Sequence, residues 1–181
     1  MAALECLEEY GFAGTSTLRI QKRAGMSRGR LLHQFASKNE LVVAAVHRLA
    51  ETRFEELGTL TANYSSERPL RAIDLLWQTH QGGLFWVATE LWLAARLDDE
   101  LRTHLLREER EIGRLIRMQC DALFGPDVVA HPSYASFREL LISSMRGVAL
   151  TYSFDKREMT TEPMLAVWRK MASEMLDLDE T

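Results

Sequence analysis

A short stretch, residues 27–34, carries the side chains with the clearest chemical potential: Ser27, Arg28, Gly29, Arg30, His33 and Gln34. Arginine and glutamine can form paired hydrogen bonds with the edges of nucleic-acid bases, and arginine also binds phosphate. Gly29 lies in a segment expected to be helical, where glycine costs about 1 kcal/mol relative to alanine. Beside a nucleic-acid backbone, the missing side chain would leave clearance. The stretch therefore indicates a base-reading surface, and the alternative is a solvated basic helix pair without a partner.

Two short helices joined by a glycine turn must position these side chains. Residues 15–17 supply N-cap side chains for the first helix, and Ser27 supplies one for the second. Gly25 permits the tight turn between them. Leu31 and Phe35, four residues apart, should fix the second helix on the core. The first helix is expected to turn three residues inward: Leu18, Ile20 and Ala24. This arrangement is a helix-turn-helix.

The charge distribution agrees with such a surface, although the whole chain of 181 residues has a net charge of −4. Residues 11–48 contain seven basic residues and one glutamate, a charge of +6, whereas both flanking segments are acidic. A basic segment within an otherwise acidic chain is the charge distribution expected of a nucleic-acid-binding domain attached to a domain with another function.

The rest of the chain reads as helical, and no stretch alternates apolar and polar residues as a strand would. Apolar residues at three-and-four spacing predict helices over about 2–10, 38–60, 69–81, 84–97, 98–124, 133–154 and 164–178. The clearest linker is 63–66. The expected fold is all-α: an N-terminal three-helix domain with the helix-turn-helix, residues 1–48, followed by a larger helical domain, residues 49–181.

The order of caps, turn glycine, core positions and basic residues over residues 1 to about 48 resembles the DNA-binding domain of the TetR (tetracycline-repressor) family. The residues that carry the resemblance are Gly11-Phe12, Thr15-Ser16-Thr17, Ile20, Ala24 to Gly29, Leu31, His33-Gln34-Phe35 and Ser37 to Leu41. Residues 49–181 are similar in layout to the family's ligand-binding and dimerising domain.

The resemblance implies specific DNA contacts. Thr15, Thr17 and Lys38 would touch phosphates, while residues 27–30, His33 and Gln34 would lie in or beside the major groove. It further implies a regulator, more often a repressor, that binds a palindromic duplex operator as a homodimer and is released by a small, mostly apolar molecule. The basic arm that commonly precedes the first helix in the family is expected to be missing from this sequence. The alternative is a protein-interaction or ligand-binding module of the same fold without DNA binding.

The middle helices contain a polar-aromatic mixture that suits a pocket for a mostly apolar ligand. The expected pocket residues are Trp77, His80, Gln81, Phe85, Trp86, Glu90, Met118, Gln119, Arg138 and Ser144. The alternative for each of them is a role in the core or on the surface.

A twofold helix-turn-helix dimer needs its recognition helices about 34 Å apart, and another part of the chain must hold that spacing. The last two expected helices each carry a broad apolar stripe, which predicts a four-helix interface between copies. The expected interface residues are Phe137, Leu141, Met145, Val148, Tyr152, Met164, Trp168, Met171 and Met175. The alternative is that both stripes pack within one chain.

No motif in the sequence indicates an enzyme active site or a metal site. The five histidines are scattered without an HExxH or a Glu-x-x-His pair, and Cys6 and Cys120 form no CxxC. We expect no cofactor, no metal and no disulfide. No apolar run reaches the roughly 18 residues of a membrane helix, and no secretion signal is evident, so a cytoplasmic protein without a membrane partner is expected.

Overall fold

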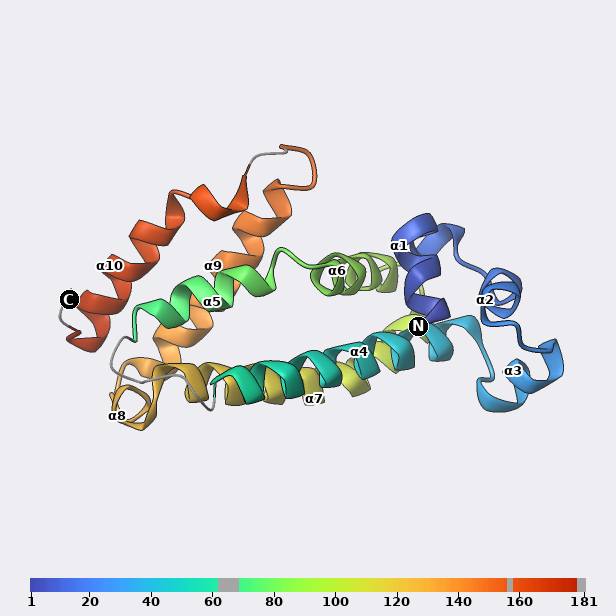
Figure 1. Ribbon diagram of the computed structural model, residues 1–181, viewed down its shortest axis with the longest axis horizontal. Coiled ribbons are helices and arrows are strands. Elements are labelled where there is room, and N and C mark those ends of the chain that lie inside the picture. Colours follow the sequence, from blue (N-terminus) through green and yellow to red (C-terminus); the bar gives the residue numbers. More distant parts are fainter. Residues whose placement is uncertain (62–68, 156–157, 179–181) are drawn as a thin grey trace. The chain divides into compact units, whose positions relative to one another are not determined.

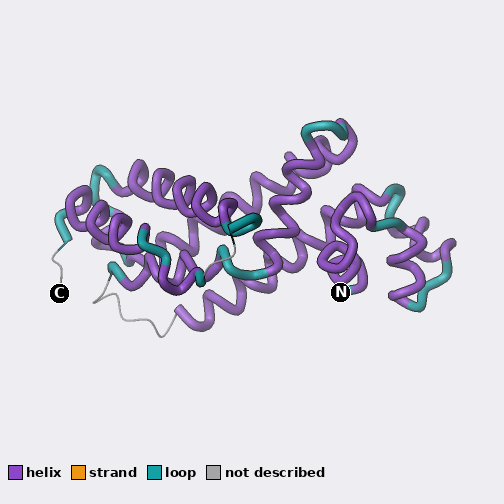
Figure 2. Tube along the Cα trace, turned by 90° about the horizontal axis from the view of Figure 1, so that it is seen from above, coloured by secondary structure: helices purple, strands orange, loops and turns teal. Residues whose placement is uncertain are grey.

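The computed structural model describes residues 1–61, 69–155 and 158–178, and over these residues it is helical, without strands (Figures 1 and 2). The helices follow in the order α1 (Ala2–Gly14), α2 (Thr17–Ala24), α3 (Arg28–Gln34), α4 (Lys38–Thr61), α5 (Arg71–Thr79), α6 (Gly83–Ala95), α7 (Asp99–Phe124), α8 (Pro126–Val129), α9 (Tyr134–Thr151), the 3-10 helix η1 (Met159–Thr161) and α10 (Met164–Leu176). The all-α expectation is confirmed. The expected linker at 63–66 lies outside the described residues.

The first helix is interrupted rather than ended at Gly11. Gly11 adopts φ 64° and ψ 178°, which is non-helical, and the helix resumes as far as Gly14. The sequence pattern predicts a helix that stops at Tyr10 with Gly11 as a left-handed cap. The positive φ is present, but three further residues return to helical conformation beyond it.

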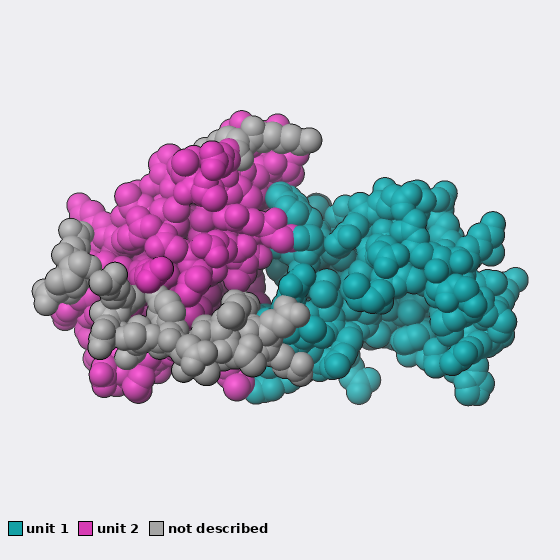
Figure 3. All heavy atoms as spheres, in the orientation of Figure 1, with its two compact units in different colours: residues 1–55, 83–115 teal, residues 56–82, 116–181 magenta. Residues whose placement is uncertain are grey.

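The chain divides into two compact units (Figure 3). Unit 1 contains residues 1–55 and 83–115, and unit 2 contains residues 56–82 and 116–181. This division follows packing, so α6 and the first part of α7 belong with the N-terminal helices. The functional boundary expected between residues 48 and 49 is a different kind of division and stays a prediction.

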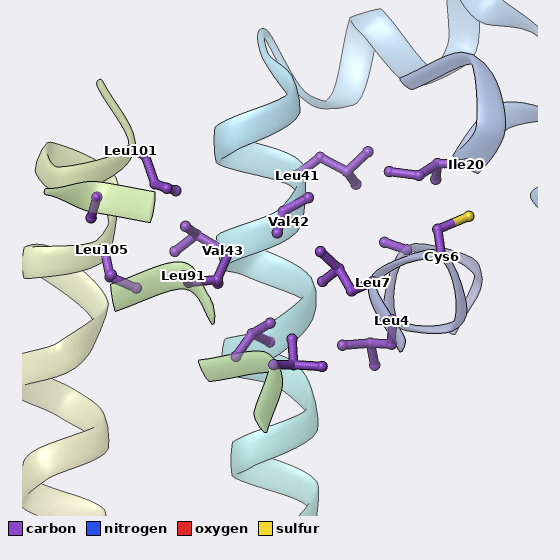
Figure 4. Close-up of a cluster of buried hydrophobic side chains, with 14 of the residues drawn as sticks. Leu4, Cys6, Leu7, Ile20, Leu41, Val42, Val43, Leu91, Leu101 and Leu105 are labelled. Atoms are coloured by element: carbon purple, nitrogen blue, oxygen red, sulfur yellow. The ribbon is translucent and has the colours of Figure 1, made fainter. Parts of the chain in front are cut away.

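The core of unit 1 gathers apolar side chains from α1, α2, α3, α4, α6 and α7 (Figure 4). Its members include Leu4, Cys6, Leu7, Ile20, Leu31, Leu41, Val42, Val43, Leu91, Leu101 and Leu105. Burial of this apolar surface is the main force that holds the helix-turn-helix on the unit. Ile20 and Leu31 turn inward as expected, whereas Leu18 is 55% exposed and Ala24 is also exposed, so the inward orientation predicted for these two is wrong.

The core of unit 2 centres on aromatic rings. Trp77 packs against Trp168 at 5.2 Å between ring centroids and meets Tyr152 edge-on at 6.0 Å. Phe124 and Phe137 form a second edge-on pair at 5.6 Å. Large buried rings contribute much of a core's stability through their area and their preferred ring geometry. Unit 2 therefore has a hydrophobic core of its own.

Both cysteines are free and buried. Burial raises the pKa of the Cys120 thiol to about 12, so this sulfur stays protonated at neutral pH and is unreactive. No helix among the described residues is long and apolar enough to cross a membrane.

Candidate nucleic-acid interface

The helix-turn-helix is set by local hydrogen bonds that its sequence supplies. Ser16 caps α2 by accepting the Arg19 N–H at 3.2 Å, and Ser27 caps α3 by accepting the Arg30 N–H at 3.3 Å. Between the two helices, Gly25 is left-handed at φ 62° and ψ 26°. Its N–H returns to the end of α2, as in a glycine C-cap. The turn is thereby fixed by backbone geometry as well as by the core.

The start of α4 is capped in a related way. Ser37 accepts the Glu40 N–H at 3.2 Å, and the Glu40 carboxylate accepts the Ala36 N–H at 2.7 Å. Ser37 and Glu40 thus form a variant of the capping box, in which the glutamate binds the N–H one residue ahead of the cap. This end of α4 follows directly after α3, so the caps fix both ends of the segment that carries the candidate base-reading side chains.

One face of α3 presents polar and basic groups outward. Leu31 is buried and Phe35 packs partly against the unit 1 core, which anchors the opposite face. The exposed residues are Ser27, Arg28, Gly29, Arg30, His33 and Gln34. A methyl group added at Gly29 would meet no atom within 4 Å, so the surface is open there. The structure brings these six predicted residues together at one exposed helix.

The arginines of α2 and α3 are used differently. Arg23 forms an ion pair with Glu9 and lies over the Tyr10 ring, and Arg19 stacks on the same ring at 4.2 Å. Within the described residues, Arg28 and Arg30 form no ion pair. The two α3 guanidinium groups can therefore donate to an external acceptor. On α2, by contrast, the charge of Arg23 is paired with Glu9 of α1.

Thr15 does not belong to the exposed set. Its side chain is buried, and its hydroxyl oxygen lies 2.9 Å from the Cys6 carbonyl and 2.7 Å from the Gly11 carbonyl, to which it donates. In this conformation Thr15 supports the end of α1 and faces away from solvent. Thr17, at the first position of α2, is half-buried. Phosphate contacts by these two residues stay predictions.

Lys38 is also held within unit 1. Its ammonium donates to the Phe12 carbonyl at 3.2 Å and lies 3.8 Å from the centroid of the Phe12 ring. Partial burial lowers the pKa of Lys38, and the nearby Asp98 carboxylate acts in the opposite direction. An ammonium has three donors, and Phe12 takes one of them. A phosphate contact by Lys38 therefore stays a prediction alongside this structural role.

The expected pocket residues are divided between the two units. Phe85, Trp86 and Glu90 lie in unit 1, where Phe85 and Trp86 meet edge-on at 5.2 Å. Glu90 is exposed, and its carboxylate accepts the Phe12 backbone N–H at 2.8 Å. The remainder lie in unit 2: Trp77, His80, Gln81, Met118, Gln119, Arg138 and Ser144. Their assembly into one pocket stays a prediction.

Within unit 2, several of these side chains serve the fold. Trp77 donates its indole N–H to the Met159 carbonyl at 2.7 Å, and Ser144 accepts the Trp168 indole N–H at 2.9 Å. Arg138 pairs with Asp121 at 2.9 Å. Burial lowers the pKa of His80 to about 4, although its hydrogen bond to a backbone carbonyl opposes this, so the ring is neutral at pH 7. The core alternative thus accounts for Trp77 through its ring packing and its hydrogen bond, without a ligand.

The expected interface residues fall into two groups. Phe137, Leu141, Met145, Tyr152 and Trp168 are buried inside unit 2 of the single chain, so they add no area to a contact between copies in this conformation. Val148, Met164, Met171 and Met175 are half-buried.

Three apolar side chains that the same helices expose were not expected from the sequence: Leu140 and Leu150 on α9, and Val167 on α10. These side chains are 50%, 42% and 52% exposed. Their helical positions, beside the apolar stripe for Leu140 and Val167 and opposite it for Leu150, were the signal that could have identified them.

Comparison with known proteins finds sequences that are similar to this chain. Residues 1–45 match the model described as "Bacterial regulatory proteins, tetR family". The chain is 25% identical over 151 residues to a protein named as an uncharacterized HTH-type transcriptional regulator of Mycobacterium tuberculosis strain H37Rv, covering 82% of this chain and 77% of the relative. The HTH-type transcriptional repressor AcnR of Corynebacterium diphtheriae is 27% identical over 127 residues, covering 68% of this chain and 63% of the relative. No solved structure matches. Residues 1–45, which contain the capped helix-turn-helix and the exposed α3 arginines, thus match the tetR family model, and the chain is similar over most of its length to proteins named as HTH-type transcriptional regulators.

Proposed function

We propose that this regulator binds a palindromic operator in duplex DNA as a homodimer, represses transcription there, and is released by a small, mostly apolar molecule. Residues 1–48 would bind the DNA, and residues 49–181 would bind the effector and form the dimer. A repressor is favoured over an activator because the relative AcnR is named a transcriptional repressor.

The observation that carries the DNA-binding part is the exposed face of α3. Arg28 and Arg30 stand on a helix that is capped by Ser27 and anchored by Leu31, and no carboxylate among the described residues neutralises either of them. A bidentate arginine on guanine discriminates against the wrong base by about 1–3 kcal/mol. Two such groups on one short helix support sequence-specific reading of a major groove.

The dimer proposal is supported by apolar side chains that the last two helices leave exposed. Leu140, Leu150 and Val167 keep about half of their area accessible to solvent, and the half-buried Val148 and Met171 lie on the same two helices. A second copy would cover this surface, and twofold symmetry would make the contact self-complementary.

The effector proposal is supported by α6. This helix carries the Phe85–Trp86 ring pair and the buried Thr89, whose hydroxyl has no hydrogen-bond partner among the described residues. Apolar rings beside one unsatisfied polar group suit a mostly apolar ligand that needs a single orienting hydrogen bond. Such a ligand can release DNA only if it prefers a conformation that DNA does not.

The proposal is tested by selecting binding sequences from a random duplex pool with this protein. Recovery of a palindrome with two half-sites about one helical turn apart supports a dimeric regulator. A folded, dimeric protein that recovers nothing above background contradicts DNA binding and favours the interaction-module alternative. Retention on a column of non-specific duplex DNA gives a second test. A DNA-binding protein is retained less as the salt concentration rises, whereas the interaction module is not retained.

Replacement of Arg30 by alanine should relax the choice of base at one or two positions of the selected site. The expected loss of discrimination is about 1–3 kcal/mol at those positions, with much smaller changes elsewhere. The matched control is Arg23→Ala, which removes the same charge from a side chain already paired with Glu9. Repeating the selection with both variants measures the effect. Equal weakening on all sequences by Arg30→Ala would show that Arg30 contacts phosphate only.

Replacement of Lys38 by alanine should weaken binding to all duplexes and reduce the slope of log affinity against log salt by about 0.9, the value for one lost phosphate contact. The control is Lys170→Ala, since Lys170 lies on α10 and pairs with Glu174. Anisotropy titrations on labelled duplex at several salt concentrations give both slopes. A slope equal to that of the unmodified protein would assign Lys38 to the Phe12 contact alone.

A further inference from the structure

The backbone of Phe12 is held from two sides, and each side belongs to a different helix. The non-helical Gly11 begins a new helical segment at Phe12, which leaves the Phe12 N–H without a helical acceptor. The carboxylate of Glu90 on α6 accepts this N–H at 2.8 Å, across 78 residues of sequence. The carbonyl of the same residue accepts the ammonium of Lys38, the first residue of α4, at 3.2 Å.

Two glycines, one on α1 and one on α6, each stand next to a glutamate carboxylate of the other helix. A Cβ at Gly11 would stand 3.1 Å from Glu90 Oε2, and a Cβ at Gly83, the first residue of α6, would stand 2.6 Å from Glu8 Oε1. Cβ atoms in proteins essentially never come as close as the 2.6 Å contact at Gly83, and they rarely come as close as the 3.1 Å contact at Gly11. The approach of the Glu90 carboxylate to the Phe12 N–H therefore depends on the bare backbone at position 11.

The start of α4 is tied to α7 as well. Asn39 is buried and donates to both carboxylate oxygens of Asp98 at 3.1 and 3.2 Å. Asp98 also accepts the Leu101 N–H at 2.8 Å, and chiefly this bond lowers the pKa of Asp98. Asp98 thus stays charged at neutral pH, caps α7 and holds the residue next to Lys38.

These contacts lie at the two ends of the helix-turn-helix. α2 and α3 are connected to the rest of unit 1 through the end of α1 and the start of α4, and both connections meet at Phe12. On the α4 side, two bonds cooperate, one from Lys38 and one from Asn39. On the α6 side, the Glu90 carboxylate supplies the hydrogen bond. Loss of Glu90 would therefore free the α1 end while the α4 end remains attached.

We propose that Glu90 is a positioning residue for DNA binding: by accepting the Phe12 N–H, it holds the end of α1 so that α3 presents Arg28 and Arg30 in the binding orientation. The inference rests on the proposed DNA-binding function, and it gives Glu90 a role different from the pocket lining expected from sequence. To hold a backbone N–H, Glu90 needs an acceptor oxygen more than a negative charge. An electrostatic effect of Glu90 on DNA binding would instead depend on the charge, so the two roles can be distinguished.

Three variants test this role. Glu90→Ala removes the acceptor, Glu90→Gln keeps an acceptor oxygen at the same reach and removes the charge, and Glu111→Ala is the control. Glu111 is a half-exposed carboxylate of unit 1 that pairs with Arg114 on its own helix, so its removal changes the net charge equally. Thermal unfolding of each variant gives the folded fraction at the assay temperature.

The first readout is the hydrogen–deuterium exchange rate of the Phe12 amide, which needs no DNA. We expect faster exchange in Glu90→Ala, a rate within about twofold of the unmodified protein in Glu90→Gln, and no change in Glu111→Ala. The second readout is affinity for the selected operator at several salt concentrations. If Glu90→Ala leaves about one tenth of the molecules in the binding orientation, the Kd rises about tenfold. The salt slope stays unchanged because no phosphate contact is lost.

The outcomes separate the two proposals. Faster Phe12 exchange with unchanged operator affinity overturns the positioning role. A Glu90→Gln variant that binds operator as poorly as Glu90→Ala shows that charge, and not the hydrogen bond, matters, and it overturns the role as well. An unmodified protein that selects no operator overturns the proposed DNA-binding function together with its dependence on Glu90, whereas the exchange rates still decide whether Glu90 holds Phe12.

Discussion

Replacement of Trp77 by alanine is expected to lower the free energy of unfolding by about 3–5 kcal/mol, the cost of removing a fully buried tryptophan ring. Trp77 is 1% exposed and packs against the rings of Trp168, Tyr152 and His80. Its indole N–H also satisfies the Met159 carbonyl at 2.7 Å. The substitution would leave both a cavity and an unsatisfied carbonyl. Urea unfolding followed by circular dichroism measures the effect.

Trp77→Phe separates the two contributions. Phenylalanine retains an aromatic ring but cannot donate a hydrogen bond, so the expected loss is smaller, about 1–3 kcal/mol. A loss below about 1 kcal/mol for Trp77→Ala would contradict the core assignment. In that case Trp77 would face a cavity that tolerates truncation, as the pocket expected from sequence requires.

Gly11→Ala is expected to lower the free energy of unfolding by about 1–3 kcal/mol, because φ 64° with ψ 178° lies in a region that is essentially restricted to glycine. The new methyl group would also stand 3.1 Å from Glu90 Oε2 and push the carboxylate away from the Phe12 N–H. We therefore expect faster exchange of the Phe12 amide in the same variant. Denaturant unfolding and hydrogen exchange measure the two effects.

Gly29→Ala is the control for the effect of adding a methyl group to a glycine. Gly29 lies within α3, has open space where a Cβ would stand and shows no positive φ. There, alanine should raise stability by up to about 1 kcal/mol through helix propensity. Equal effects of the two substitutions would contradict the strain argued for Gly11.

The features predicted best from the sequence are those fixed by neighbouring residues. Ser16 and Ser27 cap the helices that follow them, and Gly25 takes the left-handed turn, because each needs only partners within about five residues. The all-α class follows from the spacing of apolar residues over the whole chain. The four-residue helix α8 (Pro126–Val129) was missed, since a single turn contains no repeat by which periodicity could reveal it.

Contacts between distant parts of the sequence were not predictable in the same way. Lys38 has the residue type of a phosphate ligand, but its partner is the Phe12 carbonyl of α1, 26 residues away and brought near by tertiary packing. The Glu90 contact spans 78 residues, and nothing local signals it. Periodicity also shows that Phe137 and Leu141 share an apolar face of α9, yet it does not show whether that face meets the same chain or a second copy.

The placement of the tryptophans gives this protein a built-in optical probe. All four lie outside residues 1–45, with Trp86 and Trp92 on α6 of unit 1 and Trp77 and Trp168 in unit 2. Intrinsic tryptophan fluorescence therefore originates outside the segment that matches the tetR family model and reports on the surroundings of the helices proposed to bind an effector. Quenching or a spectral shift on adding candidate small molecules would reveal a ligand without DNA, an operator sequence or a reporter gene.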